Sequence, residues 1–148
     1  MKKSADINYQ LQVILSRRDH SIAETRRKLA KKGFSSTDIT AAIQIARQKK
    51  YLDDSRFAAN YINSILRQKP VGPRWLQAKL AQKGLSSELI ISALERHYPP
   101  ELESDLIKQA TQKWRALHSK DQNNQEKLTR FLISRGFSLD KITSPSTA

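Results

Sequence analysis

Cysteine is absent from this chain of 148 residues. Without it the chain cannot form disulfides or thiolate metal sites, and this fits the reducing cytosol. No apolar run approaches the roughly 20 residues that a membrane-spanning helix needs. The basic start, MKK, is not followed by the apolar core of a secretory signal peptide. We therefore expect a cytoplasmic protein that does not enter a membrane.

Patterns of catalytic and metal-binding residues are also missing. The sequence has no phosphate-cradling glycine loop of the Walker type, so it gives no sign of nucleotide hydrolysis. The histidines, His20, His97 and His118, are scattered and lack the spacing of a metal pair. Asp53 and Asp54 are adjacent, but they directly precede an amphipathic segment, where the N-cap and first turn of a helix explain them. We expect a non-enzymatic protein with no catalytic, cofactor-binding or metal-ligating residues.

One phrase of eight residues occurs three times in the chain. It reads LAKKGFSS at 29–36, LAQKGLSS at 80–87 and LISRGFSL at 132–139. Its glycines, Gly33, Gly84 and Gly136, lie 51 and 52 residues apart. A period in this range is typical of arrays of supersecondary units. The chain is therefore better described as one module used three times than as 148 independent positions.

The repeated phrase predicts a helix, a tight turn and a second helix. A glycine just past a helix end adopts the left-handed conformation without steric cost. The apolar residue after each glycine should then pack back on the leucine four positions before that glycine, as Phe34 on Leu29. The serines that follow, such as Ser35 and Ser86, are N-cap candidates for the next helix.

The flanking residues indicate further helices. Ser21 and Glu24 have the spacing of a capping box, and Pro73 suits a first helical position. Apolar residues recur every three or four positions in the segments between the phrases, including the one that begins at Phe57. We predict an all-α fold of three tandem three-helix repeats of about 50 residues, forming an elongated, curved array with three small cores in a row. The expected repeats are 1–50, 51–99 and 100–148, the last with a truncated final helix and a flexible tail.

Basic residues exceed acidic ones by a wide margin. The chain has 27 lysines and arginines against 14 acids, a formal net charge of +13. Residues 1–50 alone contain 12 of these bases and only 4 acids. An excess of this size favours a polyanionic partner, either nucleic acid or a nucleoprotein assembly, over a merely solvated surface. A membrane surface is disfavoured, because no predicted helix pairs a basic face with a wide exposed apolar one.

The contacts to that partner are expected to be electrostatic. The residues disfavour a sequence-reading recognition helix in every repeat. That helix would offer Gln44 and Arg47 in the first repeat, but Glu88 and Glu95, which repel phosphate, in the second. Contacts to backbone phosphates suit the charge distribution better. The candidate contact residues are Arg17, Arg18, Arg26, Arg27, Lys28, Lys31, Lys32, Arg56 and Arg74.

A second motif suggests a family. Residues 51–58 read YLDDSRFA, which resembles the YLDDxRFA signature of the RecX regulatory proteins. The KGF phrase lies upstream of it, the KGL phrase downstream, and the RGF phrase of the third copy also has its counterpart in that family. The resemblance extends from about Leu15 to Ile142. The matching signature residues are Tyr51, Leu52, Asp53, Asp54, Arg56 and Phe57.

This resemblance implies a non-enzymatic modulator of the RecA recombinase. Members of the family bind along the groove of RecA filaments on single-stranded DNA and restrain their growth, ATP hydrolysis, strand exchange and co-protease activity in DNA repair and the SOS response. On this basis we expect a monomer that binds the RecA filament and, non-specifically, single- or double-stranded DNA. Arg56 is the signature residue expected to contact the partner. The alternative is an autonomous DNA-binding or architectural protein acting through phosphate contacts.

Overall fold

The computed structural model describes residues 4–121 and 124–143, with side chains from residue 6 onward. Within these ranges every regular element is helical. The elements are α1 (Ser4–Arg17), α2 (Ile22–Lys31), α3 (Ser36–Gln48), α4 (Asp54–Gln68), α5 (Pro73–Gln82), α6 (Ser87–His97), α7 (Pro100–Leu117), the 3₁₀ turn η1 (Ser119–Asp121), α8 (Gln125–Ser134) and α9 (Leu139–Thr143). The predicted flexible tail, 144–148, lies outside the described residues.

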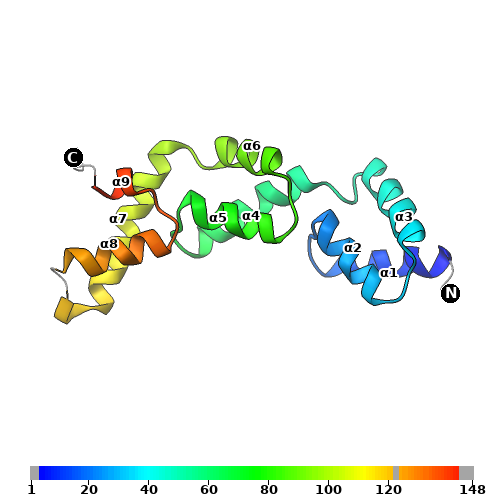
Figure 1. The fold of residues 1–148 in the computed structure, drawn as a ribbon, viewed down its shortest axis with the longest axis horizontal. Coiled ribbons are helices and arrows are strands. Elements are labelled where there is room, and N and C mark those ends of the chain that lie inside the picture. Colours follow the sequence, from blue (N-terminus) through cyan, green and yellow to red (C-terminus); the bar gives the residue numbers. More distant parts are fainter. Residues whose placement is uncertain (1–3, 122–123, 144–148) are drawn as a thin grey trace.

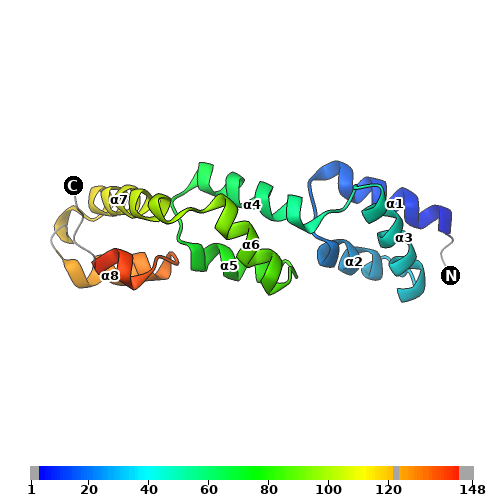
Figure 2. The ribbon, with the colours of Figure 1, turned by 90° about the horizontal axis from the view of Figure 1, so that it is seen from above.

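Three helical units follow one another along the long axis of the molecule (Figure 1). We call them unit 1 (α1–α3), unit 2 (α4–α6) and unit 3 (α7–α9). The array is bowed, with units 1 and 3 both inclined to the same side of unit 2 in this view, and the quarter turn in Figure 2 shows how narrow it is. The predicted all-α fold and its elongated, curved form are confirmed. The residue boundaries 1–50, 51–99 and 100–148 stay a prediction.

Each repeated phrase is a helix stop, as predicted. Gly33, Gly84 and Gly136 have φ of 92°, 84° and 86°. The residue after each glycine donates its N–H to the carbonyl of the phrase's leucine, at 3.4 Å for Phe34 to Leu29, and the glycine N–H bonds the next carbonyl along. This is the hydrogen-bond pattern of the Schellman motif. It brings the chain back across the helix end and buries the apolar residue beside the leucine.

The helix starts also follow the sequence signals. Ser21 and Glu24 form a complete capping box at α2. Ser35 accepts a hydrogen bond from the Asp38 N–H, and Ser86 caps α6 in the same way. These caps satisfy backbone donors that would otherwise lack partners at the helix N-termini.

The hydrophobic interior differs from our expectation. Its described residues form two clusters, so the prediction of three separate cores is wrong. One cluster belongs to unit 1, whereas the second runs without a break through units 2 and 3, from Phe57 to Phe137. The two units merge because Val71, in the loop between α4 and α5, and Tyr98, the C-cap of α6, are both buried in the shared cluster. The Tyr98 hydroxyl donates to the Val71 carbonyl at 2.8 Å. The spacing of apolar residues within one unit does not indicate whether its core is continuous with the core of the next unit.

The glycine turns serve a second purpose as joints between units. A Cβ added at Gly84 would overlap the side chain of Ala23 in unit 1, and one added at Gly136 would overlap Trp75 of unit 2. At Gly33, in contrast, an added Cβ would meet nothing within 4 Å. The start of the second helix in one unit therefore lies against the glycine turn of the next unit, and only the first turn has no preceding unit against it.

Candidate functional site

The YLDDSRFA segment forms the turn between unit 1 and unit 2. Leu52 and Phe57 are buried, whereas Tyr51 is 61% exposed. Asp53 is the N-cap of α4 and accepts hydrogen bonds from the N–H groups of Ser55 and Arg56. The side chains of this segment thus hold the chain reversal after α3 and start the next helix.

Arg56 completes the same turn. Its guanidinium donates to the carbonyls of Lys50, at 2.7 Å, and Tyr51, at 3.2 Å. Lys50 has φ of 60°, a left-handed conformation that favours glycine, so the backbone of the turn is strained. The hydrogen bonds from the Arg56 side chain help to hold the backbone in this conformation. The structure therefore ties the Arg56 guanidinium to the turn, while the residue as a whole stays exposed.

Asp54 reaches from unit 2 to unit 1. Its carboxylate accepts a 2.9 Å hydrogen bond from the backbone N–H of Ile22, the first residue of α2. Burial raises the pKa of Asp54, while the hydrogen bond from Ile22 acts in the opposite direction. A carboxylate at a helix N-terminus is also stabilised by the helix dipole. Asp54 therefore fixes the start of α2 to the start of α4.

A second polar cluster joins the same two units at the other side of the α2 start. The hydroxyl of Ser21 donates to the carbonyl of Lys83 at 2.6 Å, and Glu24 forms ion pairs with Arg18 at 2.6 Å and Lys83 at 3.5 Å. Burial by itself would raise the pKa of Glu24. The hydrogen bonds from Arg18 and the Ser21 N–H, with the charges of Arg18 and Lys83, outweigh it and lower this pKa to about 2. Glu24 is therefore ionised at neutral pH and fixes two cations in place.

Cations from both units gather around this junction. A hollow of about 400 Å³, which we call the basic hollow, lies between α2 and the end of α5. A neighbouring groove of about 530 Å³ runs along α4. Lys83 lines both depressions. The basic hollow is lined by Glu24, Arg27, Lys28, Lys31, Gln82 and Lys83. The groove along α4 adds the cations Arg18 and Arg67, together with Asp19, two aromatic side chains and three small polar ones.

Two of these cations are held by neighbouring groups. The guanidinium of Arg27 donates to the carbonyl of Gln82 at 3.3 Å. The ammonium of Lys28 lies 2.7 Å from Nε2 of the buried His20, whose Nδ1 lies 2.9 Å from the carbonyl of Arg18. This arrangement requires a neutral His20 with its proton on Nδ1. Burial lowers the pKa of His20, and the charges of Arg18 and Lys28 lower it further.

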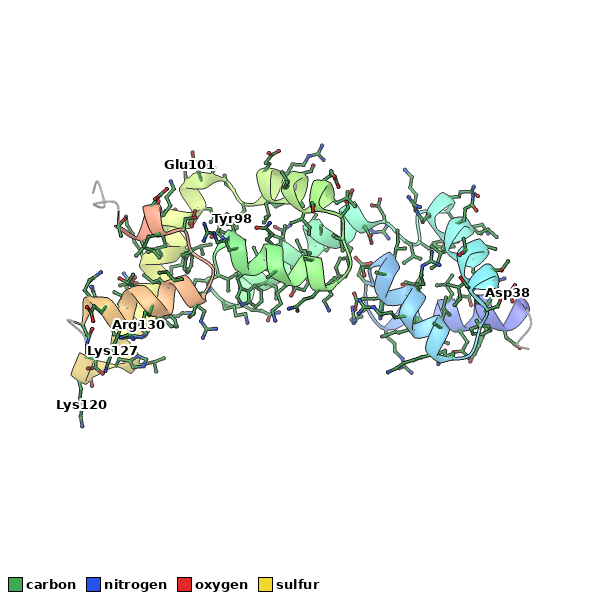
Figure 3. All side chains as sticks on the ribbon, in the orientation of Figure 1. Asp38, Tyr98, Glu101, Lys120, Lys127 and Arg130 are labelled. Atoms are coloured by element: carbon green, nitrogen blue, oxygen red, sulfur yellow. The ribbon has the colours of Figure 1, made fainter. Side chains whose placement is uncertain are left out.

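The other candidate cations do not join the basic hollow. Arg26 bonds the hydroxyl of Thr40 on α3, so it lies on another side of α2. Arg74 lies at the joint between units 2 and 3, where its N–H donates to the Gly136 carbonyl at 3.2 Å. Arg17 ends α1, and Lys32 is the C-cap of α2 beside Gly33. In unit 3, Lys120, Lys127 and Arg130 lie at the far end of the array from α2 (Figure 3).

Lys83 and Arg67 were missed as candidate contact residues. The sequence identifies Lys83 only as a cation before a helix-stop glycine, and nothing in it places this residue beside α2. The missing signal is the packing of one unit on the next, which a repeat pattern does not contain. The sequence did identify three of the lining residues, Arg27, Lys28 and Lys31, because they are clustered on a single helix.

The described part of the chain contains neither a metal-binding cluster nor a membrane-spanning helix. No group of three or more histidine or acidic side chains in 4–121 and 124–143 is arranged to hold a metal ion. Among the same residues, no helix is long and apolar enough to span a membrane.

Comparison with family models matched all three units of the chain. The models described as the first, second and third three-helix domains of RecX match residues 13–44, 53–94 and 101–144. A relative named regulatory protein RecX, from Vibrio parahaemolyticus, is 37% identical over 131 residues, which are 88% of this chain and 83% of the relative. Another of that name, from Chlorobaculum tepidum, is 36% identical over 141 residues, 95% of this chain and 86% of the relative.

Solved structures of the same family have the same fold. The crystal structure of RecX from Lactobacillus salivarius superposes with a TM-score of 0.85 at 22% identity, covering 94% of this chain and 91% of that one. A second crystal structure of a regulatory protein RecX gives a TM-score of 0.84 at 21% identity and covers 93% of this chain and 68% of that one. The chain belongs to the RecX family of regulatory proteins.

Proposed function

We propose that this protein binds RecA filaments formed on single-stranded DNA and restrains their recombinase, ATPase and co-protease activities, without catalysing a reaction itself. The observation that carries the proposal is the basic hollow, where Lys31 of unit 1 and Lys83 of unit 2 converge beside Arg27 and Lys28. Lysine and arginine side chains that line one exposed depression from two units suit contacts to the phosphates of a nucleic-acid backbone.

The shape of the molecule supports the same proposal. Its units follow one another in a narrow, bowed array, which can lie along a helical nucleoprotein filament and contact several protomers (Figures 1 and 2). The relatives are named regulatory proteins, and the family resemblance supplies RecA as the regulated partner. The net charge of +13 favours DNA within the filament as part of the contact surface.

The same charge supports a second candidate, an autonomous DNA-binding or architectural protein. The two candidates differ in what limits their effect. A regulator of the filament should act at concentrations far below those that cover the DNA, whereas a protein that competes only for DNA must cover it first.

The test is a titration into RecA assembled on poly(dT), with ATP hydrolysis as the readout. Binding to the same poly(dT) without RecA is measured in parallel by anisotropy. We expect hydrolysis to fall while most of the DNA is still free of this protein. If hydrolysis falls only as the DNA becomes saturated, the proposal is overturned in favour of the autonomous DNA-binding protein. Lys31→Glu should shift the titration to higher concentration, whereas Lys120→Glu, at the far end of the array, should leave it unchanged.

A further inference from the structure

A third depression lies in unit 1, between α1, α3 and the beginning of α4. It has a volume of about 860 Å³ and is distinct in its lining from the basic hollow. Helices α1 and α3 lie side by side along it (Figure 2). Leu11, Leu15, Ala42 and Ala46 contribute its apolar lining. We call it the α1–α3 groove.

Two large side chains that line the groove are exposed to solvent. Ile45 is 50% exposed and Tyr51 is 61% exposed, and both line the groove. A single exposed isoleucine on a monomer is ordinary, but here an exposed isoleucine and an exposed tyrosine line the same depression, whose lining mixes apolar with polar side chains such as Asn8 and Gln12. Covering these two side chains together would remove more apolar surface from water than covering either alone. Tyrosine is also enriched at protein interfaces, because its ring is rigid and its hydroxyl remains free to form hydrogen bonds.

The charge along the groove has one sign. Lys49, Lys50 and Arg56 line it, and among the described residues that line it none is acidic. Arg56 is held beside the groove by the carbonyls of Lys50 and Tyr51, so its charge does not depend on a flexible side chain finding its place. A partner that fills this groove must therefore offer apolar side chains to the floor and carboxylates to the basic end.

An amphipathic helix meets both requirements. Helices that bind in grooves present apolar side chains at every third or fourth position, and their polar face can carry the complementary charge. A nucleic acid strand would satisfy the cations and could stack on Tyr51, but it would leave the aliphatic floor around Leu15 and Ile45 without a matching surface. We propose that the α1–α3 groove binds an acidic amphipathic helix of a partner protein, with its apolar face on Ile45 and Tyr51 and its carboxylates at Lys49 and Lys50.

The inference goes beyond the proposed function, because it concerns another surface and needs neither RecA nor DNA. Its test uses the full chain and a fluorescein-labelled peptide of about 16 residues, in which leucines recur every three or four positions and glutamates fill the rest. Anisotropy should give saturable binding. A peptide with serine in place of leucine, and one with lysine in place of glutamate, should each bind at least about tenfold more weakly.

Substitutions on the protein locate the binding site. Ile45→Glu places a carboxylate in the groove and should weaken binding of the peptide about tenfold or more. Ile91→Glu is the matched control, because Ile91 is 53% exposed on α6, away from the groove, and it should bind as the unsubstituted chain does. Lys49→Glu should weaken binding as well, whereas Lys108→Glu on α7 should not. Circular dichroism verifies that each variant keeps its helices.

Several results would overturn the proposal. One is that the leucine and serine peptides bind equally well. Another is that Ile45→Glu and Ile91→Glu weaken peptide binding equally. A third is that oligo(dT) displaces the peptide, which would assign the groove to nucleic acid. Self-association that Ile45→Glu abolishes in sedimentation, with no peptide binding, would assign the groove to a second copy of the chain. None of these results alters the ATP hydrolysis titration, so the two proposals fail independently.

Discussion

The carboxylate of Asp54 and the backbone N–H of Ile22 form a 2.9 Å hydrogen bond between two units, across 32 positions of sequence. Asp54 belongs to α4 and Ile22 begins α2, so one side chain of the YLDDSRFA segment sets the position of a helix in the preceding unit. Its neighbour Asp53 caps its own helix instead. The two adjacent carboxylates thus have separate structural duties, one within unit 2 and one between units.

Removing the Asp54 carboxylate should destabilise the protein without changing its helix content. Asp54→Ala leaves the half-buried start of α2 without its acceptor, and we expect the free energy of unfolding to fall by about 1–2 kcal/mol. Asp105→Ala is the control, since Asp105 is an exposed carboxylate on α7. Urea denaturation followed by circular dichroism measures both. Equal midpoints for the two variants would contradict a role for Asp54 at this joint.

The glycine turns offer an internally matched comparison. Gly33→Ala and Gly84→Ala both place a Cβ on a residue with φ near 90°, which costs about 1–2 kcal/mol. Only the second also overlaps Ala23, so we expect it to lose about 1–3 kcal/mol more in urea denaturation. Ala23→Gly combined with Gly84→Ala should recover much of that additional loss, because it removes the overlapping atom. If the two single variants are equally stable, the close approach at Gly84 does not matter.

Acid should weaken the junction between units 1 and 2. The pKa of Glu24 in the folded protein is about 2, below its ordinary value of 4.5, so its contribution to stability is complete above pH 4.5 and is lost as the pH falls toward 2. Glu24→Gln should remove this part of the pH dependence. The measurement is the urea midpoint at a series of pH values from neutral to 2. If the urea midpoint of Glu24→Gln falls with pH below 4.5 as steeply as that of the unsubstituted chain, Glu24 is not the source of the acid sensitivity.

The salt dependence of binding to single-stranded DNA should show whether the cations of the basic hollow contact the DNA. Lys31→Gln removes one cation that faces the hollow, so binding should weaken and the slope of log K against log salt should become less steep by about 0.7. Lys120→Gln, in the 3₁₀ turn of unit 3, should keep the full slope. Arg26→Gln should have less effect than Lys31→Gln, because Arg26 bonds Thr40 on α3. Identical slopes for Lys31→Gln and Lys120→Gln would leave the hollow without a role in DNA binding.

The sequence predicts local structure well and contacts between units poorly. The Gly33 turn, the Ser21 capping box and the N-cap role of Asp53 could all be predicted because each depends on residues within one or two helical turns. The second role of Gly84, against Ala23, could not, because it depends on how two units pack. The fusion of the cores of units 2 and 3 was missed for the same reason.

The candidate site divides along the same line. Arg27, Lys28 and Lys31 could be found because one helix carries them all. Lys83 completes the basic hollow from another unit, and the motif around it indicates only a helix end. Arg56 shows a role that the signature did not indicate, since its guanidinium bonds two backbone carbonyls of its own turn. Its expected contact with a partner stays a prediction.

The joints between units have a consequence for how such a chain can diverge. The hydrogen bond from the Gly72 N–H to the Arg135 carbonyl, at 2.8 Å, uses only backbone atoms, and the bond from Ser21 ends on the backbone carbonyl of Lys83. Bonds that end on backbone atoms add few constraints on side-chain identity to those set by the glycines and by Ser21, Glu24 and Asp54. The outer faces can therefore change charge and shape while the packing of one unit on the next is kept, in line with a TM-score of 0.85 at only 22% identity.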